Sequence, residues 1–208
     1  MPAEVWAQLE AGNQRFIDGT PLHPRQDAER RSETSGAQHP MVAIFGCSDS
    51  RLAAEIIFDV GLGDAFVVRN AGQVISDSVV GSLEYAVGVL GVHMIVVLGH
   101  DKCGAVLAAI ASQAPDADPL PPNIQLVIDR IIPAVHRVAG GAEAAKTAAA
   151  TVDDLAVGRE HLHDTISELL KRSELISDAI AAGTLAIVGA NYRLGEGKVA
   201  PDLVVGQI

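Results

Sequence analysis

The chain has 208 residues, which is enough for one domain with a full hydrophobic core, and we predict a single domain over residues 1–208. Hydrophobic residues make up 49% of the chain and charged residues 20%, a balance that excludes a disordered protein. The formal net charge of −11 argues against nucleic acid or an anionic membrane as a partner, although one local arginine can still bind a small anion.

The N-terminal segment predicts a helix followed by a polar, proline-punctuated stretch. Val5 and Leu9 lie on one stripe of a helix over residues 3–18, and a second short helix is expected at 27–35. We interpret residues 1–36 as a helical arm. The segment lacks the basic and apolar regions of an export signal, so we expect a cytoplasmic protein.

Apolar runs that alternate with helical patterns predict the fold. Continuous runs such as residues 94–98 (MIVVL) are typical of buried parallel strands. We therefore expect an α/β fold, with a mostly parallel central β-sheet flanked by helices. The apolar stretch 79–99 contains Glu84 and His93 and is interrupted by Gly88 and Gly91, which argues against a membrane span. The expected strands are 41–45, 65–69, 94–98, 185–188 and 199–205. The expected helices are 53–58, 78–89, 103–111, 124–138 with a bend at Pro133, and 151–182, with caps at Asp77 or Ser78 and at Thr151.

Two polar strings directly follow two of these strands. The string CSDSR occupies residues 47–51, and HDKC occupies residues 100–103. Ligands bind at the carboxyl ends of strands in an open parallel sheet, so the two strings are expected to meet in one crevice. Cys47, His100 and Cys103 then offer two thiolates and an imidazole, which are ligands that zinc prefers.

Interpretations of these residues without a catalytic role remain open at this point. Cys47 and Cys103 can form a disulfide or be buried core thiols, although metal binding or catalysis fits a chain without an export signal better. A zinc site here can also be purely structural. His161 and His163 are two positions apart in a predicted helix and point to different faces, so we interpret them as solvated or capping residues.

The two strings, together with further segments along the chain, resemble the β-class carbonic anhydrases. The resemblance covers nearly the whole length. The matching segments are GNQRF at 12–16, QHP at 38–40, CSDSR at 47–51, FVVRNAG at 66–72, SLEYAV at 82–87 and GHDKCG at 99–104. The resemblance implies a zinc-dependent carbonate dehydratase, a lyase that hydrates CO2 reversibly to bicarbonate and a proton by attack of a zinc-bound hydroxide.

The resemblance also assigns the metal site and its neighbours. It implies one Zn²⁺ per chain on Cys47, His100 and Cys103, with water or Asp49 in the fourth position. In the active form Asp49 pairs with Arg51 instead, and both residues are catalytic.

The remaining implications of the resemblance concern the substrate pocket and the oligomer. Gln38, Phe66 and Tyr85 line the pocket for CO2 or bicarbonate, which lies at a subunit interface. We therefore expect a homodimer or homotetramer in which the N-terminal helix packs on the partner subunit. Two other functions remain open: a different hydrolase on the same scaffold, such as a carbon disulfide hydrolase, and a zinc-stabilised interaction module without enzymatic activity.

A departure from the family pattern concerns regulation. Some β-class enzymes are inhibited by bicarbonate in a second pocket that uses a tryptophan three residues before the first cysteine ligand, an arginine and a tyrosine. In this chain Ile44 occupies the tryptophan position, while Arg69 and Tyr192 match the other two. The missing indole N–H predicts that strong bicarbonate inhibition of this kind is absent.

Overall fold

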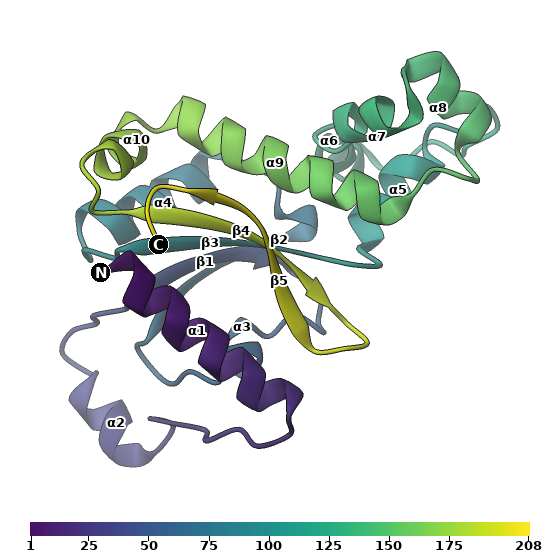
Figure 1. Cartoon of the computed structure of the whole chain (residues 1–208). Coiled ribbons are helices and arrows are strands. Elements are labelled where there is room, and N and C mark those ends of the chain that lie inside the picture. Colours follow the sequence, from purple (N-terminus) through teal and green to yellow (C-terminus); the bar gives the residue numbers. More distant parts are fainter.

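A computed structural model describes all residues, 1–208, and has one five-stranded sheet at its centre (Figure 1). The strand order is β2-β1-β3-β4-β5, with β1 to β4 parallel and β5 antiparallel to β4. This arrangement confirms the predicted α/β fold with a mostly parallel sheet. The strands are β1 (Val42–Cys47), β2 (Ala65–Asn70), β3 (Met94–His100), β4 (Ala186–Arg193) and β5 (Lys198–Val205).

Helices cover both faces of the sheet, because β1 and β3 are apolar on both sides. Along β3, Met94 and Val96 face one buried cluster, whereas Ile95 and Val97 face the other. The first face is covered by α1 (Pro2–Ile17) and α3 (Ala54–Ile57), and the second by α4 (Asp77–Gly88), α9 (Asp154–Arg172) and α10 (Glu174–Ala181) (Figure 1). The short α2 (Ala28–Glu33) lies outside these layers.

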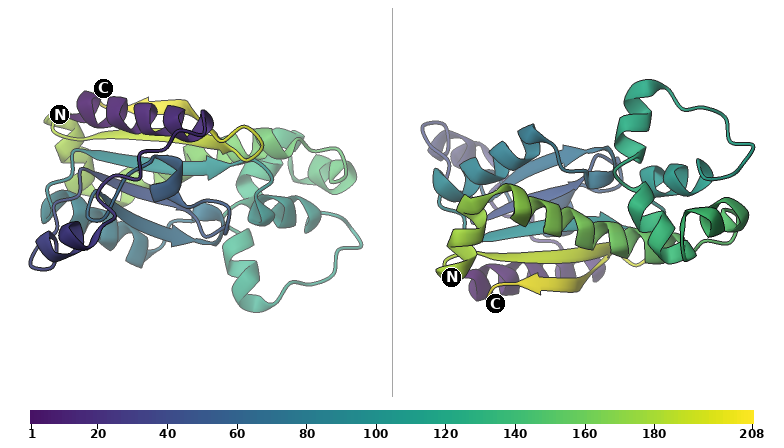
Figure 2. Two further views of the ribbon diagram at one scale, coloured as in Figure 1. Left: turned by 90° about the horizontal axis from the view of Figure 1, so that it is seen from below. Right: turned by 90° about the horizontal axis from the view of Figure 1, so that it is seen from above.

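A group of shorter helices extends beyond the carboxyl end of the parallel strands (Figure 2). These helices pack against the end of α9 and one another, and they extend the first buried cluster past the end of the sheet. They are α5 (Gly104–Ala111), α6 (Pro122–Ile128), α7 (Ile132–Ala139) and α8 (Ala142–Ala148). The crevice expected from the sequence lies where this group meets the sheet. None of the helices combines the length and apolar character needed to cross a membrane.

The N-terminal helix α1 lies along β5 of its own chain (Figure 2). Val5, Trp6 and Leu9 are buried in the first core cluster, and the amide of Asn13 donates to the carbonyl of Ile57 at 3.1 Å. The chain thus buries the apolar stripe of this helix without a partner. Packing of α1 on a second subunit, and a separate arm over residues 1–36, stay predictions.

The helices differ from the sequence-based expectation at two breaks and at the caps. The stretch expected as one helix over 124–138 is two helices, α6 and α7, with Pro133 in the first turn of α7, and the stretch 151–182 is divided into α9 and α10 at Ser173. The helix expected from Asp77 or Ser78 is capped by Ser76, whose side chain accepts from the amide of Val79. The cap expected at Thr151 is wrong: Asp153 caps α9 and accepts from two of its first amides. Both cap corrections have one cause, since several adjacent residues are good caps and only the backbone path selects one.

Candidate metal centre

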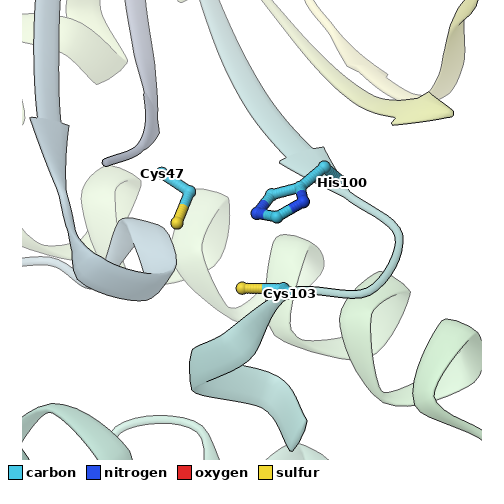
Figure 3. Close-up of side chains that lie close together, drawn as sticks. All are labelled: Cys47, His100 and Cys103. Atoms are coloured by element: carbon cyan, nitrogen blue, oxygen red, sulfur yellow. The ribbon is translucent and has the colours of Figure 1, made fainter. Parts of the chain in front are cut away.

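Cys47, His100 and Cys103 converge at the carboxyl end of the sheet (Figure 3). Cys47 is the last residue of β1, His100 is the last residue of β3, and Cys103 is the N-cap of α5. All three residues are buried, and their ligand atoms lie within 4.8 Å of one another. The sequence-based expectation that the two strings meet in one crevice is therefore confirmed.

The backbone brings these residues together because β1 and β3 are parallel neighbours. Gly46 pairs with Leu98, so both strands end at nearly the same level. The loop after β3 then turns sharply back, with Lys102 in the left-handed region at φ 52°. The side chain of Asp101 fixes this loop, since it accepts from the backbone amide of Leu194 at 2.8 Å.

The imidazole of His100 is oriented as a metal ligand. Its Nδ1 lies 2.8 Å from the carbonyl oxygen of Asp101, which can only accept a hydrogen bond, so Nδ1 carries the proton. Its Nε2 then has a free lone pair, is buried and has no hydrogen-bond partner. A buried nitrogen without a partner is costly unless something else binds it. Holding Nδ1 on a backbone carbonyl is also how metal-binding histidines are usually oriented.

The two thiols share their protons unevenly. A hydrogen bond from Cys103, with a smaller contribution from the backbone amide of Gly72, lowers the pKa of Cys47 to about 4. The same contact raises the pKa of Cys103. The pair therefore loses one proton readily and keeps the second, which a bound cation replaces. Both cysteines are free in the structure, with no disulfide between them.

The donor set fits zinc. Two thiolates and one imidazole are soft and borderline ligands, and a tetrahedral ion with bonds of about 2.0–2.3 Å fits between atoms this close. Three protein ligands also leave one coordination position open, whereas structural zinc sites use four. The unpartnered Nε2 of His100 is the atom that most directly requires a cation.

Asp49 lies beside this group and is paired with Arg51. Its two carboxylate oxygens accept from Nε and a terminal nitrogen of Arg51 at 2.9 and 2.7 Å. These bonds hold the pKa of Asp49 well below its usual range, so the carboxylate is ionised. One Asp49 oxygen also lies 4.0 Å from Nε2 of His100. Asp49 thus faces the metal centre but is held on Arg51.

Arg69 is an anchor of the site that the sequence did not single out for this role. Its guanidinium donates to the carbonyl oxygens of Cys47 at 3.0 Å and Asp49 at 2.6 Å, which fixes the backbone between them. The signal was its position one residue before the end of β2, since Gly46 is its partner in the register.

His161 is the clearest error of the sequence-based interpretation. It is only 2% exposed, and its Nε2 donates to the carbonyl of Gly72 at 2.7 Å, so it is neither solvated nor capping. His163 is partly exposed and pairs with Asp202, as expected of a surface residue. The spacing of Val157 and Leu162 along α9 would have placed position 161 on the buried stripe.

The three expected pocket residues do not gather at the metal centre of their own chain. Phe66 pairs with Ala43 in the register, four positions before Cys47, which is about 13 Å along the strand. Phe66 packs against Tyr85 of α4 with ring centroids 6.2 Å apart, and Tyr85 is 45% exposed. Gln38 is exposed ahead of β1. Within one chain, Phe66 and Tyr85 lie at the sheet edge formed by β2.

Comparison with known proteins agrees with this geometry. The family model described as "Carbonic anhydrase" matches residues 42–199. A carbonic anhydrase of Mycolicibacterium smegmatis and carbonic anhydrase 2 of Mycobacterium tuberculosis are each 46% identical over 208 residues, covering 100% of this chain and 96% of theirs. A tetrameric β-carbonic anhydrase of Sordaria macrospora has the same fold, with a TM-score of 0.69, 22% identity, and coverage of 95% and 96% of the two chains.

Family membership thus rests on both sequence and structure. The family match spans the two ligand strings and the strands that carry them. The relatives align over the full chain, which includes α1 and α9. This chain therefore belongs to the β-class carbonic anhydrases.

Proposed function

We propose that this protein is a zinc enzyme that catalyses the reversible hydration of CO2 to bicarbonate and a proton. The observation that carries the proposal is the convergence of Cys47, His100 and Cys103 around a buried nitrogen without a partner. An ionised carboxylate beside this group adds what a structural metal site does not need. Membership of the carbonic anhydrase family and its full-length relatives support the same reaction.

Cys47, His100 and Cys103 would hold one zinc ion per chain. When bound, zinc supplies a Lewis acid that makes hydroxide available from water near neutral pH. CO2 is a weak electrophile and neutral water a weak nucleophile, so the reaction needs this chemistry. The role of the three side chains is to fix the ion at the end of the sheet, beside the Asp49 carboxylate.

Asp49 and Arg51 would orient the nucleophile. An ionised carboxylate accepts hydrogen bonds and donates none. Asp49 would therefore accept a hydrogen bond from a water or hydroxide at the site and orient it toward CO2. Arg51 keeps Asp49 ionised and holds both of its oxygens in a bidentate pair. With zinc bound, the same pair would hold the carboxylate away from the metal.

Gln38, Phe66 and Tyr85 would complete the pocket of a second subunit. Phe66 and Tyr85 pack together at the β2 edge of this chain, with Phe66 four register positions before the level of Cys47, and Gln38 is exposed ahead of β1. A homodimer, or a homotetramer built from dimers, would place this apolar edge over the partner's metal centre. CO2 is apolar, so Phe66 and Tyr85 suit it as a wall, while the Gln38 amide can hold a bicarbonate oxygen. A cytoplasmic location stays part of this proposal.

The proposal is tested with metal-free and zinc-loaded protein in a stopped-flow CO2 hydration assay. We expect activity only in the zinc-loaded sample, with one zinc per chain by metal analysis. A protein that binds one zinc per chain but hydrates no CO2 at neutral or alkaline pH would contradict the proposal and favour an interaction module. Turnover of carbon disulfide in place of CO2 would keep the metal site and change the substrate.

A further inference from the structure

A buried histidine outside the metal centre remains without a role in the reaction. His161 lies in the middle of α9 and is 2% exposed. Burial lowers its pKa, so the ring is neutral. Its Nε2 donates to the carbonyl of Gly72 at 2.7 Å, which places the proton on Nε2 and leaves Nδ1 bare. Nδ1 is buried and has no partner.

Gly72 connects this histidine to the metal centre. It is the central residue of η1 (Ala71–Gln73), the turn after β2. Its carbonyl accepts from His161, and its amide donates to the Sγ of Cys47 at 3.4 Å. A short path of hydrogen bonds thus runs from α9 through one residue to a zinc ligand. An amide aimed at a thiolate stabilises its negative charge, so the orientation of Gly72 affects how Cys47 binds a cation.

The position of Gly72 is constrained on its other sides as well. Its φ of 71° is in the left-handed region, and a side chain at this position would come within 2.8 Å of Ala105 and 3.0 Å of Ile131. Thr165, four residues after His161 on the same face of α9, lies 3.4 Å from the carbonyl of Gln73. The helix α9 therefore contacts two consecutive carbonyls of η1, and His161 makes the shorter contact.

The chemistry of this position is unusual for a core residue. A buried nitrogen without a hydrogen-bond partner destabilises the fold. An apolar side chain of similar size would fill the same space without this cost. Val157, one turn before His161 on the same face of α9, is the buried apolar residue that such a side chain would join. The hydrogen bond to Gly72 is the one interaction in which the imidazole differs from leucine.

We propose that His161 is a positioning residue for the metal centre: by holding the carbonyl of Gly72, it directs the amide of Gly72 at Cys47 and so strengthens zinc binding. The proposal concerns metal affinity and does not depend on which substrate the enzyme uses. If the protein bound zinc and hydrated no CO2, the role of His161 would still be measurable.

The test compares two substitutions that differ in one hydrogen bond. His161→Leu keeps the volume and removes the donor, whereas His161→Gln keeps an N–H near the place of Nε2. We expect H161L to weaken zinc binding about tenfold in competition with a chelator, and H161Q to restore most of the affinity. In Co²⁺-substituted protein, the thiolate-to-metal absorption should change in H161L and return toward the wild type in H161Q.

Two control variants separate positioning from general stability. Leu169→Ala removes a fully buried side chain from the same helix, away from η1, and should lower the melting temperature without changing zinc affinity. His163→Ala removes the exposed imidazole two residues away and should change neither. Wild-type affinity and cobalt spectrum in H161L would overturn the proposal, and so would an H161Q variant that binds zinc as weakly as H161L. If H161L does not fold, His161→Met takes its place as the variant without a donor.

Discussion

The carboxyl end of the sheet and the β2 edge differ in how much of their chemistry one chain supplies. At the carboxyl end, all three metal ligands are buried and fixed by contacts within the chain. At the β2 edge, Tyr85 is 45% exposed and Phe66 has only Tyr85 as an aromatic partner. One chain brings the metal ligands together by itself, and the open β2 edge supports the proposal that a second subunit closes the substrate pocket.

The largest expected effect comes from disrupting the metal centre at the carboxyl end of the sheet. Cys103→Ser should abolish zinc binding and CO2 hydration together, because a serine hydroxyl is a poor zinc ligand and only two good ligands remain. Zinc content per chain and initial hydration rate are the measurements. Ser50→Ala, an exposed change in the other ligand-bearing loop, is the matched control and should keep both. Full zinc occupancy in the Cys103 variant would remove this residue from the ligand set.

Arg51→Ala should separate metal binding from catalysis within the same end of the sheet. All three ligands stay, so zinc content should be unchanged. Asp49 loses the two bonds that hold it on the guanidinium and becomes free to occupy the open position on the metal. We expect turnover to fall by orders of magnitude, on the scale that loss of a positioned catalytic group produces. Arg51→Lys keeps the charge without the bidentate geometry, and its turnover should lie between those of the wild type and R51A. Near-normal turnover in R51A would show that the pair has no role in the reaction.

The β2 edge is tested by Phe66→Ala. This substitution should leave the zinc content intact and reduce CO2 hydration about tenfold, because one wall of the proposed pocket is lost. Val89→Ala, an exposed apolar change just after α4, is the control and should keep full activity. Light scattering on the same samples reports the oligomeric state. A fully active monomer would contradict the shared pocket.

Combining a metal-centre variant with a β2-edge variant in one oligomer gives a sharper test. Co-expression of Cys103→Ser and Phe66→Ala chains should rebuild intact sites, because the mixed dimer combines the metal of one chain with the edge of the other. Random pairing makes half of the dimers mixed, with one intact site each, so about a quarter of the sites should recover. Activity no higher than the average of the two variants alone would place Phe66 and the metal it serves in the same chain.

The same contrast explains which parts of the molecule could be predicted from the sequence. The apolar runs of β1 and β3 and the strings after them are local patterns, and they were sufficient to predict the parallel sheet and the meeting of Cys47, His100 and Cys103. The role of Arg69 depends on its register opposite Gly46, which no local pattern encodes. The burial of His161 follows from the local spacing along α9, but its hydrogen-bond partner, Gly72, is 89 residues away. Long-range hydrogen bonds of this kind become visible only when the helices are packed.

The smallest expected effect concerns inhibition by bicarbonate. The position that carries a tryptophan in the inhibited relatives is Ile44, which is 1% exposed and belongs to the core. Arg69, the matching arginine, is already engaged by the carbonyls of Cys47 and Asp49. Tyr192, the matching tyrosine, is 4% exposed. A bicarbonate ion at this place would lack the indole donor, and its arginine is already committed to the backbone of the metal loop.

A buried anion that lacks one hydrogen bond is held less tightly by about 1–3 kcal/mol, which is a roughly five- to 150-fold weaker site. We therefore expect the initial CO2 hydration rate, at fixed pH and ionic strength, to stay nearly flat as bicarbonate is raised. Sodium chloride at matched concentration controls for general anion effects. Steep and cooperative inhibition by bicarbonate alone would show that Ile44 does not disable the second pocket. It would also show that Arg69 can leave the carbonyls it holds, and the ligand loop after β1 would then be less rigid than the loop after β3.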